Sequence, residues 1–341
     1  MSLRSSYALR SSYKNSAVLK KLASGIIVCS SINQVEEFKS VLRRERSRTH
    51  DVTILLLDLV KVDRVAPIRE LVGFLTALDC LALTFPLDSI STYRRSRSIL
   101  PSITFSKLTT FSSNLPHAAL ASFLAHQPQL RSLTLGPCGS SCICPLGACT
   151  SFANLTSVKC EDFECVLQMR ASASSLASIQ VVALDVESPE PLTNVRALRF
   201  SASGSDAQVV RRLTGLVPNV ELLAIIEHSP SSAELDSQPA LALSVSLAAW
   251  AEDFLRLPCL YKVQVQLQGR FGSCLDNDGP EVRRWLARCS RHMTLRRVSL
   301  WTESSNAAHG GRLRTWVRRD SNWEPVLDQQ GGYLEEHHVL D

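Results

Sequence analysis

The 341-residue sequence lacks any run of about 18 apolar residues, the length that a membrane-spanning helix requires. The apolar run over 25–29 is too short, and the run over 51–62 is interrupted by Asp58 and Lys61. We therefore expect no membrane span.

The motifs of common nucleotide-binding and hydrolytic enzymes are also missing. No expected strand is followed by GxGxxG or GxxxxGK(S/T), and no GxSxG occurs. Gly310-Gly311 and Gly331-Gly332 lie in polar stretches that are typical of loops, and His337-His338 is expected to be a solvated terminal pair. We expect no enzyme activity, no catalytic residue and no cofactor.

Charge of one sign is not in large excess. The 37 basic and 32 acidic residues give a net charge of +5, far from the imbalance of a dedicated nucleic-acid binder. The last third interleaves arginine with tryptophan, but Arg283, Arg284 and Arg288 fall on the polar side of an expected helix and are interpreted as its solvated face. We therefore do not expect the chain to bind nucleic acid. With 45% hydrophobic residues, it is expected to be globular.

Acidic residues are absent from the first 35 positions, and Glu36 is the first. A basic, serine-rich segment of this kind also occurs in mitochondrial transit peptides. We predict a partly disordered leader over 1–33, a repeat region over 34–323 and a flexible tail over 324–341. The expected location is cytoplasmic or nuclear, with mitochondrial targeting as the alternative.

The 11 cysteines are odd in number and scattered, and several occupy apolar positions of expected elements. These are Cys80, Cys160, Cys259 and Cys289. Free cysteine packs as a small hydrophobic residue, whereas secreted disulfide frameworks are short and dense in cysteine. We therefore expect a reducing, intracellular environment.

One stretch is dense in cysteine and contains Cys138, Cys142, Cys144 and Cys149. Four thiolates can bind zinc tetrahedrally, but the spacing differs from paired CxxC knuckles and no histidine is near in the sequence. We predict a loop with free thiols or a local redox pair and no metal site, and a zinc site is the alternative.

A six-residue pattern recurs along the chain: apolar, two variable, apolar, one variable, apolar. Copies begin at Val52, Leu78, Leu130, Leu155, Ile179, Val195, Val220, Leu260 and Leu295, with a degenerate copy over 108–113. The intervals between copies are mostly in the twenties and thirties. Each copy predicts a short strand.

Helical spacing of apolar residues precedes several copies, and helices are expected over 36–46, 68–78, 117–127, 206–217, 247–257 and 281–291. Pro128, Pro218 and Pro258 end three of these segments and direct the chain into an extended conformation. The alternation favours an α/β fold, a βα solenoid with a curved parallel sheet on the concave side and helices on the convex side. A doubly wound sheet is the alternative.

With these motifs the sequence resembles the leucine-rich-repeat family, particularly the repeat region of fungal proteins that also carry an F-box. The resemblance covers about 34–323 and includes joints such as Gln127-Pro128-Gln129-Leu130 and the segment 316–323. The family's residue that bonds the turn after the strand matches only at Leu135-Gly-Pro-Cys138, and no F-box is recognisable. The resemblance implies a protein-interaction scaffold for substrate recognition in a ubiquitin ligase, with the ligase adaptor as partner only if an F-box lies upstream.

In such a repeat, the last two apolar residues of a strand point into the core, and the residues between and beside them point to the concave face. This nominates a set of partner-binding residues: Lys159, Arg199, Lys262, Gln264, Gln266, Arg297 and Trp301. Because several are basic or long and polar, we expect a protein partner with an acidic surface. An enzyme on a doubly wound sheet, with no recognisable motif, is the alternative function.

Overall fold

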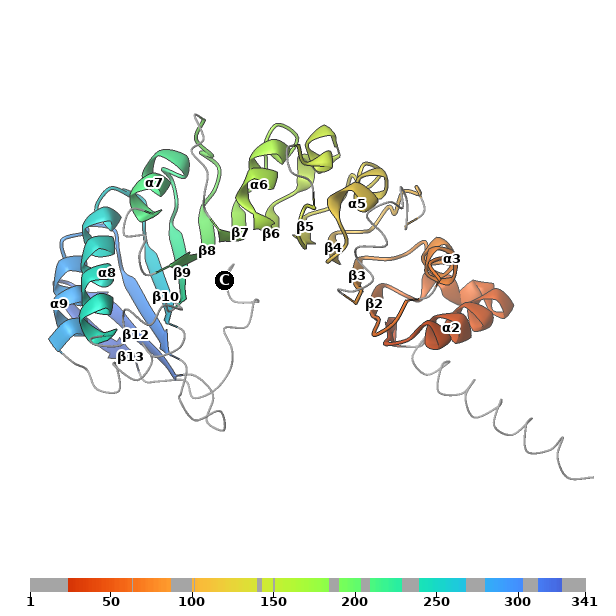
Figure 1. Ribbon diagram of the computed structural model, residues 1–341, viewed down its shortest axis with the longest axis horizontal. Helices are drawn as coiled ribbons and strands as arrows, with labels where there is room; N and C mark the ends of the chain where they lie inside the picture. Colours follow the sequence, from red (N-terminus) through yellow and green to blue (C-terminus); the bar gives the residue numbers. More distant parts are fainter. Residues whose placement is uncertain are drawn as a thin grey trace, which may run out of the picture. The chain divides into compact units, whose positions relative to one another are not determined.

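The computed structural model describes residues 24–62, 64–86, 100, 102–139, 143–149, 151–183, 190–203, 209–228, 239–267, 280–302 and 312–326. The chain divides into two compact units after Leu176. Both units alternate strands and helices (Figure 1), which confirms the predicted α/β class with mostly parallel strands.

The first unit contains six parallel strands that pair in sequence order. Its elements are β1 (Ile26–Cys29), α2 (Ile32–Arg44), η1 (Arg46–His50), β2 (Ile54–Asp58), α3 (Ala66–Phe74), β3 (Cys80–Thr84), β4 (Thr110–Ser113), α5 (His117–Leu124), β5 (Ser132–Leu135), η2 (Pro145–Ala148), η3 (Phe152–Asn154), β6 (Ser157–Asp162) and α6 (Phe163–Met169). The η elements are short 3-10 helices.

The second unit contains five strands in sequence order, with parallel pairing in the same manner, and ends in an antiparallel hairpin. Its elements are β7 (Ser178–Ala183), β8 (Ala197–Ser203), α7 (Val209–Leu216), β9 (Leu222–His228), α8 (Pro239–Phe254), β10 (Lys262–Leu267), α9 (Pro280–Cys289), β11 (Arg297–Thr302), β12 (Arg312–Arg319) and β13 (Asn322–Val326). Asp320, with φ of 56°, makes the hairpin turn. No helix among the described residues combines the length and apolarity that crossing a membrane demands.

Burial alternates along the strands. In β2, Leu55 and Leu57 are buried whereas Ile54 and Leu56 are half-buried, and β10 alternates in the same way. Strand pairing aligns the buried positions into one row in each unit, and each residue of these rows is at most 1% exposed. The rows are Ile27, Leu55, Leu81, Phe111, Leu133 and Val158 in the first unit, and Ile179, Leu198, Leu223, Val263 and Val298 in the second. One face of each sheet therefore packs into the core and the other is more open.

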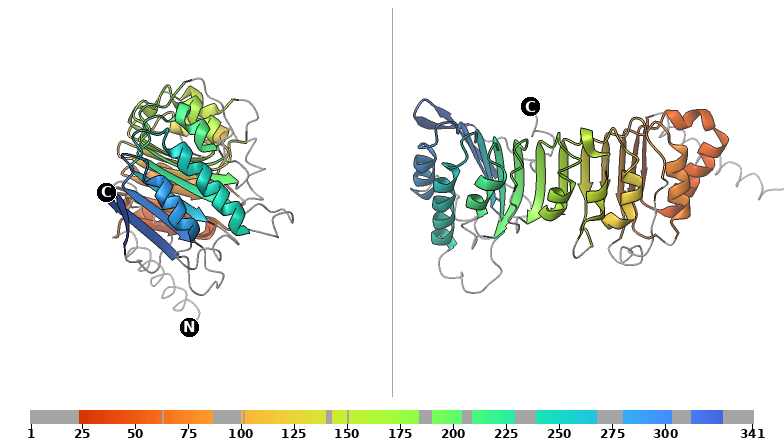
Figure 2. Two further views of the ribbon diagram at one scale, coloured as in Figure 1. Left: turned by 90° about the vertical axis from the view of Figure 1, so that its left-hand side faces the viewer. Right: turned by 90° about the horizontal axis from the view of Figure 1, so that it is seen from above.

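The helices of each unit lie on one side of its strands, as the views in Figures 1 and 2 show. A doubly wound sheet carries helices on both faces and reverses its strand order near the middle. The strands of each unit instead follow the chain order without reversal. Neither unit is doubly wound, so that alternative is excluded for both.

Each parallel strand starts from the same hydrogen-bond arrangement. The carbonyl of the residue before one strand accepts from two consecutive amides of the next repeat; Gly25 O, for example, accepts from Thr53 N at 2.9 Å and Ile54 N at 3.0 Å. The other accepting carbonyls belong to Thr53, Asp79, Thr109, Arg131, Ala177, Arg196, Glu221 and Tyr261. Gly25 itself has φ of 74°, and a Cβ there would lie 3.1 Å from Asp51 O, so this position suits glycine.

The ten predicted strand segments, including the degenerate copy over 108–113, are confirmed as β2 to β11. The register predicted for the copy at Ile179 is wrong, because Ile179 and Val181 are buried in β7 whereas Val182, which the pattern places in the core, is exposed. Most strands begin two residues after the pattern does, because the first apolar residue, such as Val52 or Leu130, packs into the core ahead of the strand. The repeat pattern did not indicate β1, α6 or the hairpin. Since β1 starts at Ile26, the predicted leader boundary at residue 33 lies inside the fold, and β13 likewise extends past residue 323.

Side-chain amides and hydroxyls satisfy the backbone at the turns, where the resemblance led us to look for a regular asparagine or cysteine. The residue just before a first apolar position repeatedly donates to a carbonyl of the preceding repeat: Asn154 to Pro128 O at 2.8 Å, Asn219 to Thr193 O at 2.9 Å and Thr294 to Pro258 O at 2.9 Å. These three contacts hold neighbouring repeats together at equivalent places.

Buried Gln127 makes the most extensive contact of this kind. Its Nε2 donates to Ile103 O at 2.7 Å and Phe123 O at 3.0 Å, and its Oε1 accepts from Phe105 N at 3.1 Å. One side chain thus satisfies three backbone groups, and two of these hydrogen bonds are buried.

Leu133 lies in the buried row between Phe111 and Val158. We predict that Leu133→Ala lowers the free energy of unfolding by about 2–5 kcal/mol, because it leaves a cavity in the row. Thr134→Ala, on the more accessible face of the same strand, should change the free energy of unfolding by less than about 0.5 kcal/mol. Urea unfolding followed by circular dichroism measures both, and equal losses would contradict the assignment of faces.

We predict that Gln127→Leu lowers the free energy of unfolding by about 2 kcal/mol or more, since buried backbone groups lose their partners. Gln129→Leu is the matched control, because it makes the same change at an exposed position two residues away. Urea unfolding again provides the measurement. A Gln127→Leu protein as stable as the Gln129→Leu control would show that these hydrogen bonds contribute nothing.

Candidate functional site

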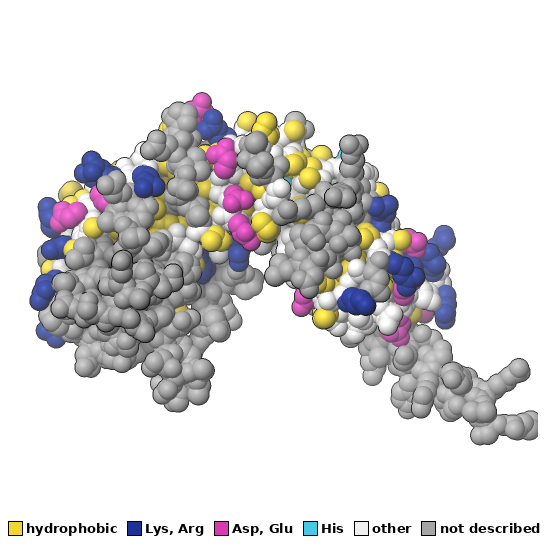
Figure 3. Space-filling view, viewed as in Figure 1, with side chains coloured by type: hydrophobic (Ala, Val, Ile, Leu, Met, Phe, Trp, Pro, Cys, Tyr) yellow, Lys and Arg dark blue, Asp and Glu magenta, His cyan; other side chains and the backbone are white. Residues whose placement is uncertain are grey.

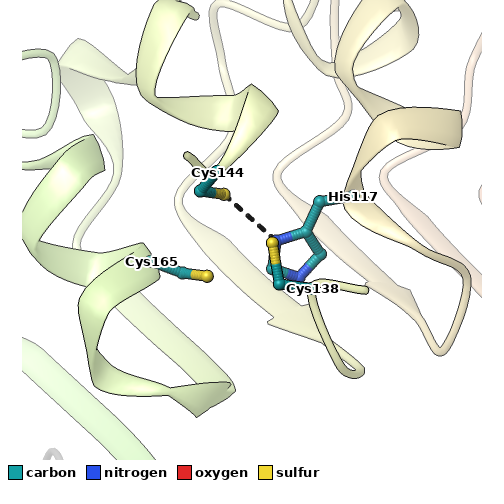
Figure 4. A group of neighbouring side chains, drawn as sticks. All are labelled: His117, Cys138, Cys144 and Cys165. Atoms are coloured by element: carbon teal, nitrogen blue, oxygen red, sulfur yellow. Dashed lines mark hydrogen bonds between the residues drawn. The ribbon is translucent and has the colours of Figure 1, made fainter. Parts of the chain in front are cut away.

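Four metal-binding side chains meet in the first unit. His117 is the first residue of α5, Cys138 follows β5, Cys144 precedes η2, and Cys165 lies in α6. Their sulfur atoms and a ring nitrogen all lie within 4.8 Å of one another, and Figure 4 shows them pointing toward a common centre. All four are buried, with exposed fractions of 0% for His117 and 3–6% for the cysteines. We call these residues the thiol–imidazole cluster.

This cluster differs from the four cysteines that the sequence analysis considered as possible zinc ligands. Cys138 and Cys144 take part as considered there, but Cys149 does not, because its Sγ approaches Ala121 O at 3.7 Å. Cys142 lies outside the described residues. The histidine that the cysteine-rich stretch lacks in sequence comes from His117, 27 residues before Cys144.

The hydrogen bonds of His117 orient its ring. Its Nε2 lies 3.0 Å from Gly136 O, and because a carbonyl only accepts, Nε2 carries the hydrogen. In the neutral imidazole, Nδ1 then has a free lone pair, and this atom is 3.2 Å from the Sγ of Cys144. Gly136 cannot carry a side chain here, since a Cβ would lie 2.8 Å from the Cα of Asn114.

The cluster favours a thiolate at Cys144. A hydrogen bond from the Cys165 thiol is the largest cause that lowers the pKa of Cys144, to about 4, and the contacts with the His117 ring and the Leu146 backbone lower it as well, against the opposing effect of burial. The same contact with Cys144, together with burial, raises the pKa of Cys165. Burial raises the pKa of the nearby Cys149 to about 11 and of Cys160 to about 12, so those two remain thiols.

A thiolate beside an imidazole can act as a nucleophile or as a metal ligand. Nucleophilic catalysis requires a substrate to reach the sulfur, and Cys144 is buried together with its three neighbours. An enclosed set of three thiols and one imidazole is the donor set of structural zinc sites. The geometry therefore fits an ion better than a catalytic thiol.

Side chains around the cluster hold its backbone in place. Cys144 N donates to Gln168 Oε1, and Gln168 Nε2 donates to Glu164 Oε1 at 3.0 Å. Cys138 N lies 3.5 Å from Asp162 Oδ2. Residues of β6 and α6 thus position the loop that carries two of the cysteines.

The predicted partner-binding residues mostly share a sheet face in the second unit. Lys262, Gln264 and Gln266 are half-buried and alternate along β10 with buried residues. Arg297 of β11 lies directly opposite Lys262, and Arg199 Nη2 of β8 lies 3.5 Å from Gln266 Oε1. We call these five residues the open face. Lys159 is half-buried at a corresponding position of β6 in the first unit.

Trp301 pairs in register with Gln266 and lies on the same sheet face, but it is buried, which corrects its prediction as a partner-binding residue. It is only 3% exposed and lies opposite Leu313 of β12. The hairpin, which the sequence pattern did not indicate, continues the sheet beyond β11, so β11 is an interior strand and not the last one. Its neighbour Ser299 is buried as well and lies 3.0 Å from the hydroxyl of Thr315.

Two like charges face each other on the open face. Burial lowers the pKa of Lys262, and the nearby Arg297 guanidinium lowers it further.

The exposed arginines of α9, by contrast, lie on the solvated side of their helix, as predicted. These are Arg283, Arg284 and Arg288. Figure 3 shows Lys and Arg side chains gathered around α7 to α9 on this helical side.

Glu227 is a buried charge that the sequence pattern did not indicate. It extends β9 beyond the predicted segment, lies between Ala202 of β8 and Leu267 of β10, and is 0% exposed. Its carboxyl oxygens have no hydrogen-bond partner within the described part of the chain. Burial raises the pKa of Glu227 to about 7.

The comparisons with known proteins give no relative: no protein-family model matches the chain, and no curated protein matches its sequence.

We predict that Glu227 makes stability depend on pH. Because its pKa is about 7 in the folded state and about 4.5 in an unfolded chain, the folded state binds more protons between these values. Stability should therefore fall as pH rises from about 4.5 through 7, by about 3 kcal/mol in total from this group. Glu227→Gln should remove this dependence and stabilise the protein at pH 8.

Urea unfolding of the wild type and of Glu227→Gln at a series of pH values measures the effect. Glu221→Gln, which changes an exposed carboxyl at the start of the same strand, is the control and should keep the wild-type dependence. Parallel pH profiles for the wild type and Glu227→Gln would contradict the assignment.

Proposed function

We propose that the chain is a protein-interaction scaffold whose partner contacts the open face through acidic groups. The observation that carries this proposal is the placement of Lys262 directly opposite Arg297 on an accessible sheet face. Like charges at opposing positions of neighbouring strands destabilise a sheet. A partner carboxylate would relieve this repulsion.

The surroundings of the two cations support the proposal. Neither Lys262 nor Arg297 forms an ion pair with an acidic side chain in the described ranges. The neighbouring amides of Gln264 and Gln266 can donate hydrogen bonds to the same acceptor groups. The open face therefore offers charge and hydrogen-bond donors side by side.

The proposal includes the type of fold, a βα solenoid of the leucine-rich-repeat kind. Sequential parallel strands, helices on one side and a repeated accepting carbonyl are what a βα solenoid of the leucine-rich-repeat kind requires. Solenoids of this kind bind partners on the exposed sheet face. The alternative function, an enzyme on a doubly wound sheet, has no support from the fold, because neither unit has that topology.

The role in a ubiquitin ligase is a further part of the proposal and depends on the sequence resemblance alone. It requires an F-box in addition to the elements described above. Affinity purification of the tagged chain from a fungal extract tests it, with recovery of the ligase adaptor as the expected result. Failure to recover the adaptor would remove the ligase role and leave the scaffold proposal standing.

We predict that reversing the two charges weakens binding of acidic peptides. Selection of a random displayed peptide library against the full chain should enrich sequences rich in Asp and Glu. Lys262→Glu combined with Arg297→Glu should weaken binding of the enriched peptides by about tenfold or more.

The matched control is Arg283→Glu combined with Arg284→Glu, which makes the same change in charge on the solvated side of α9. This control should bind like the wild type. Enriched peptides without acidic residues, or equal losses in both double variants, would count against the open face as the binding surface.

A further inference from the structure

In its described residues, the crossover between β5 and β6 differs from three others of the first unit. The β1–β2, β2–β3 and β4–β5 connections contain the helices α2, α3 and α5. In the described part of the β5–β6 connection, the regular structure is two short 3-10 helices, η2 and η3. Such helices form few backbone hydrogen bonds, so this crossover needs another means of support.

We propose that the thiol–imidazole cluster is a structural zinc site in which His117 Nδ1 and the sulfur atoms of Cys138, Cys144 and Cys165 bind one Zn²⁺. Zinc–sulfur bonds of about 2.3 Å in a tetrahedron place ligand atoms about 3.8 Å apart. The four donor atoms already lie within 4.8 Å of one another. Closure around an ion needs contraction by about 1 Å or less.

The donor set selects the type of metal. Thiolates and imidazole are soft to borderline ligands that favour zinc, whereas Ca²⁺ and Mg²⁺ require oxygen ligands. All four tetrahedral positions come from the protein and all four residues are buried, which leaves no position for a substrate. These features indicate a structural role.

The surrounding hydrogen bonds match what metal ligands require. Gly136 O accepts from His117 Nε2, so that Nδ1 faces the centre, and the backbone N–H of Leu146 bonds the Cys144 sulfur. Such contacts fix the orientation of ligands and stabilise thiolate charge. On binding, the remaining thiol protons pass to water, and three thiolates with Zn²⁺ leave a net charge of −1.

A metal at this place would connect three consecutive parts of the first unit. Its ligands come from the start of α5, from the connection before η2, and from α6. The ion would supply the support that an α-helix gives in the other crossovers. This proposal is independent of partner binding at the open face of the second unit.

Elemental analysis of the full chain, expressed and purified with zinc and a reductant, tests the site. We expect about one zinc per chain. After removal of zinc, titration with Co²⁺ should give the visible absorption bands of a tetrahedral thiolate site. Zinc content near zero together with no such Co²⁺ spectrum would overturn the proposal.

Variants test which residues are ligands. Cys165→Ser and His117→Ala should each reduce zinc to below about one tenth per chain after dialysis. Cys149→Ser and Cys160→Ser are the matched controls, because they change buried thiols of the same region that lie outside the cluster. Both controls should retain about one zinc. Zinc retained in the ligand variants, or lost in the controls, would contradict the proposed ligand set.

A measurement on the wild type covers the case in which ligand variants fail to fold. Alkylation under native conditions, mapped by mass spectrometry, should modify Cys138, Cys144 and Cys165 only after a chelator is added. The half-buried Cys80 and Cys259 should react under both conditions. Reaction of the three cysteines that does not depend on chelator, or a disulfide between Cys144 and Cys165 in place of metal, would overturn the site.

Discussion

The structure depends on one repeated interaction, in which a carbonyl before one strand accepts hydrogen bonds from two consecutive amides of the next repeat. This contact sets the register of each parallel pair at its first residue. Because side chains alternate between faces, a slip of one residue would place Lys262 and Gln264 in the core and expose Val263. The buried rows and the open face both follow from this register.

The strand pattern was predictable because it is local. Three apolar residues at fixed spacing describe one buried face of a short strand, and no distant contact is needed to recognise them. The segment over 26–29 is apolar throughout and shows no alternation, which is why β1 was missed. The seven-residue α6 follows β6 directly, without the helical run and proline that indicated the other helices.

The thiol–imidazole cluster could be predicted only in part, because half of its ligands are distant in the sequence. Cys138 and Cys144 drew attention through their density, but His117 and Cys165 join them only through the packing of α5 and α6 on the same connection. The sequence signal that remains is modest: a histidine at the start of one expected helix and a cysteine two residues into a helix that was not expected. Trp301 was wrongly predicted because the repeat pattern indicates which face of the sheet a residue lies on but not whether that position is covered, and Trp301 is only 3% exposed.

Glu227, Cys144 and Lys262 show how burial decides what compensates the charge of an ionisable group. Glu227 is completely enclosed between strands, and its raised pKa means that a proton neutralises it near neutral pH. Cys144 is also enclosed, but its lowered pKa favours the thiolate, and only a group small enough to lie among its neighbours can balance that charge. Lys262 keeps part of its surface accessible beside Arg297, so a macromolecule can approach and supply the opposite charge. A buried thiolate therefore favours an ion, whereas a half-exposed pair of cations favours a partner protein.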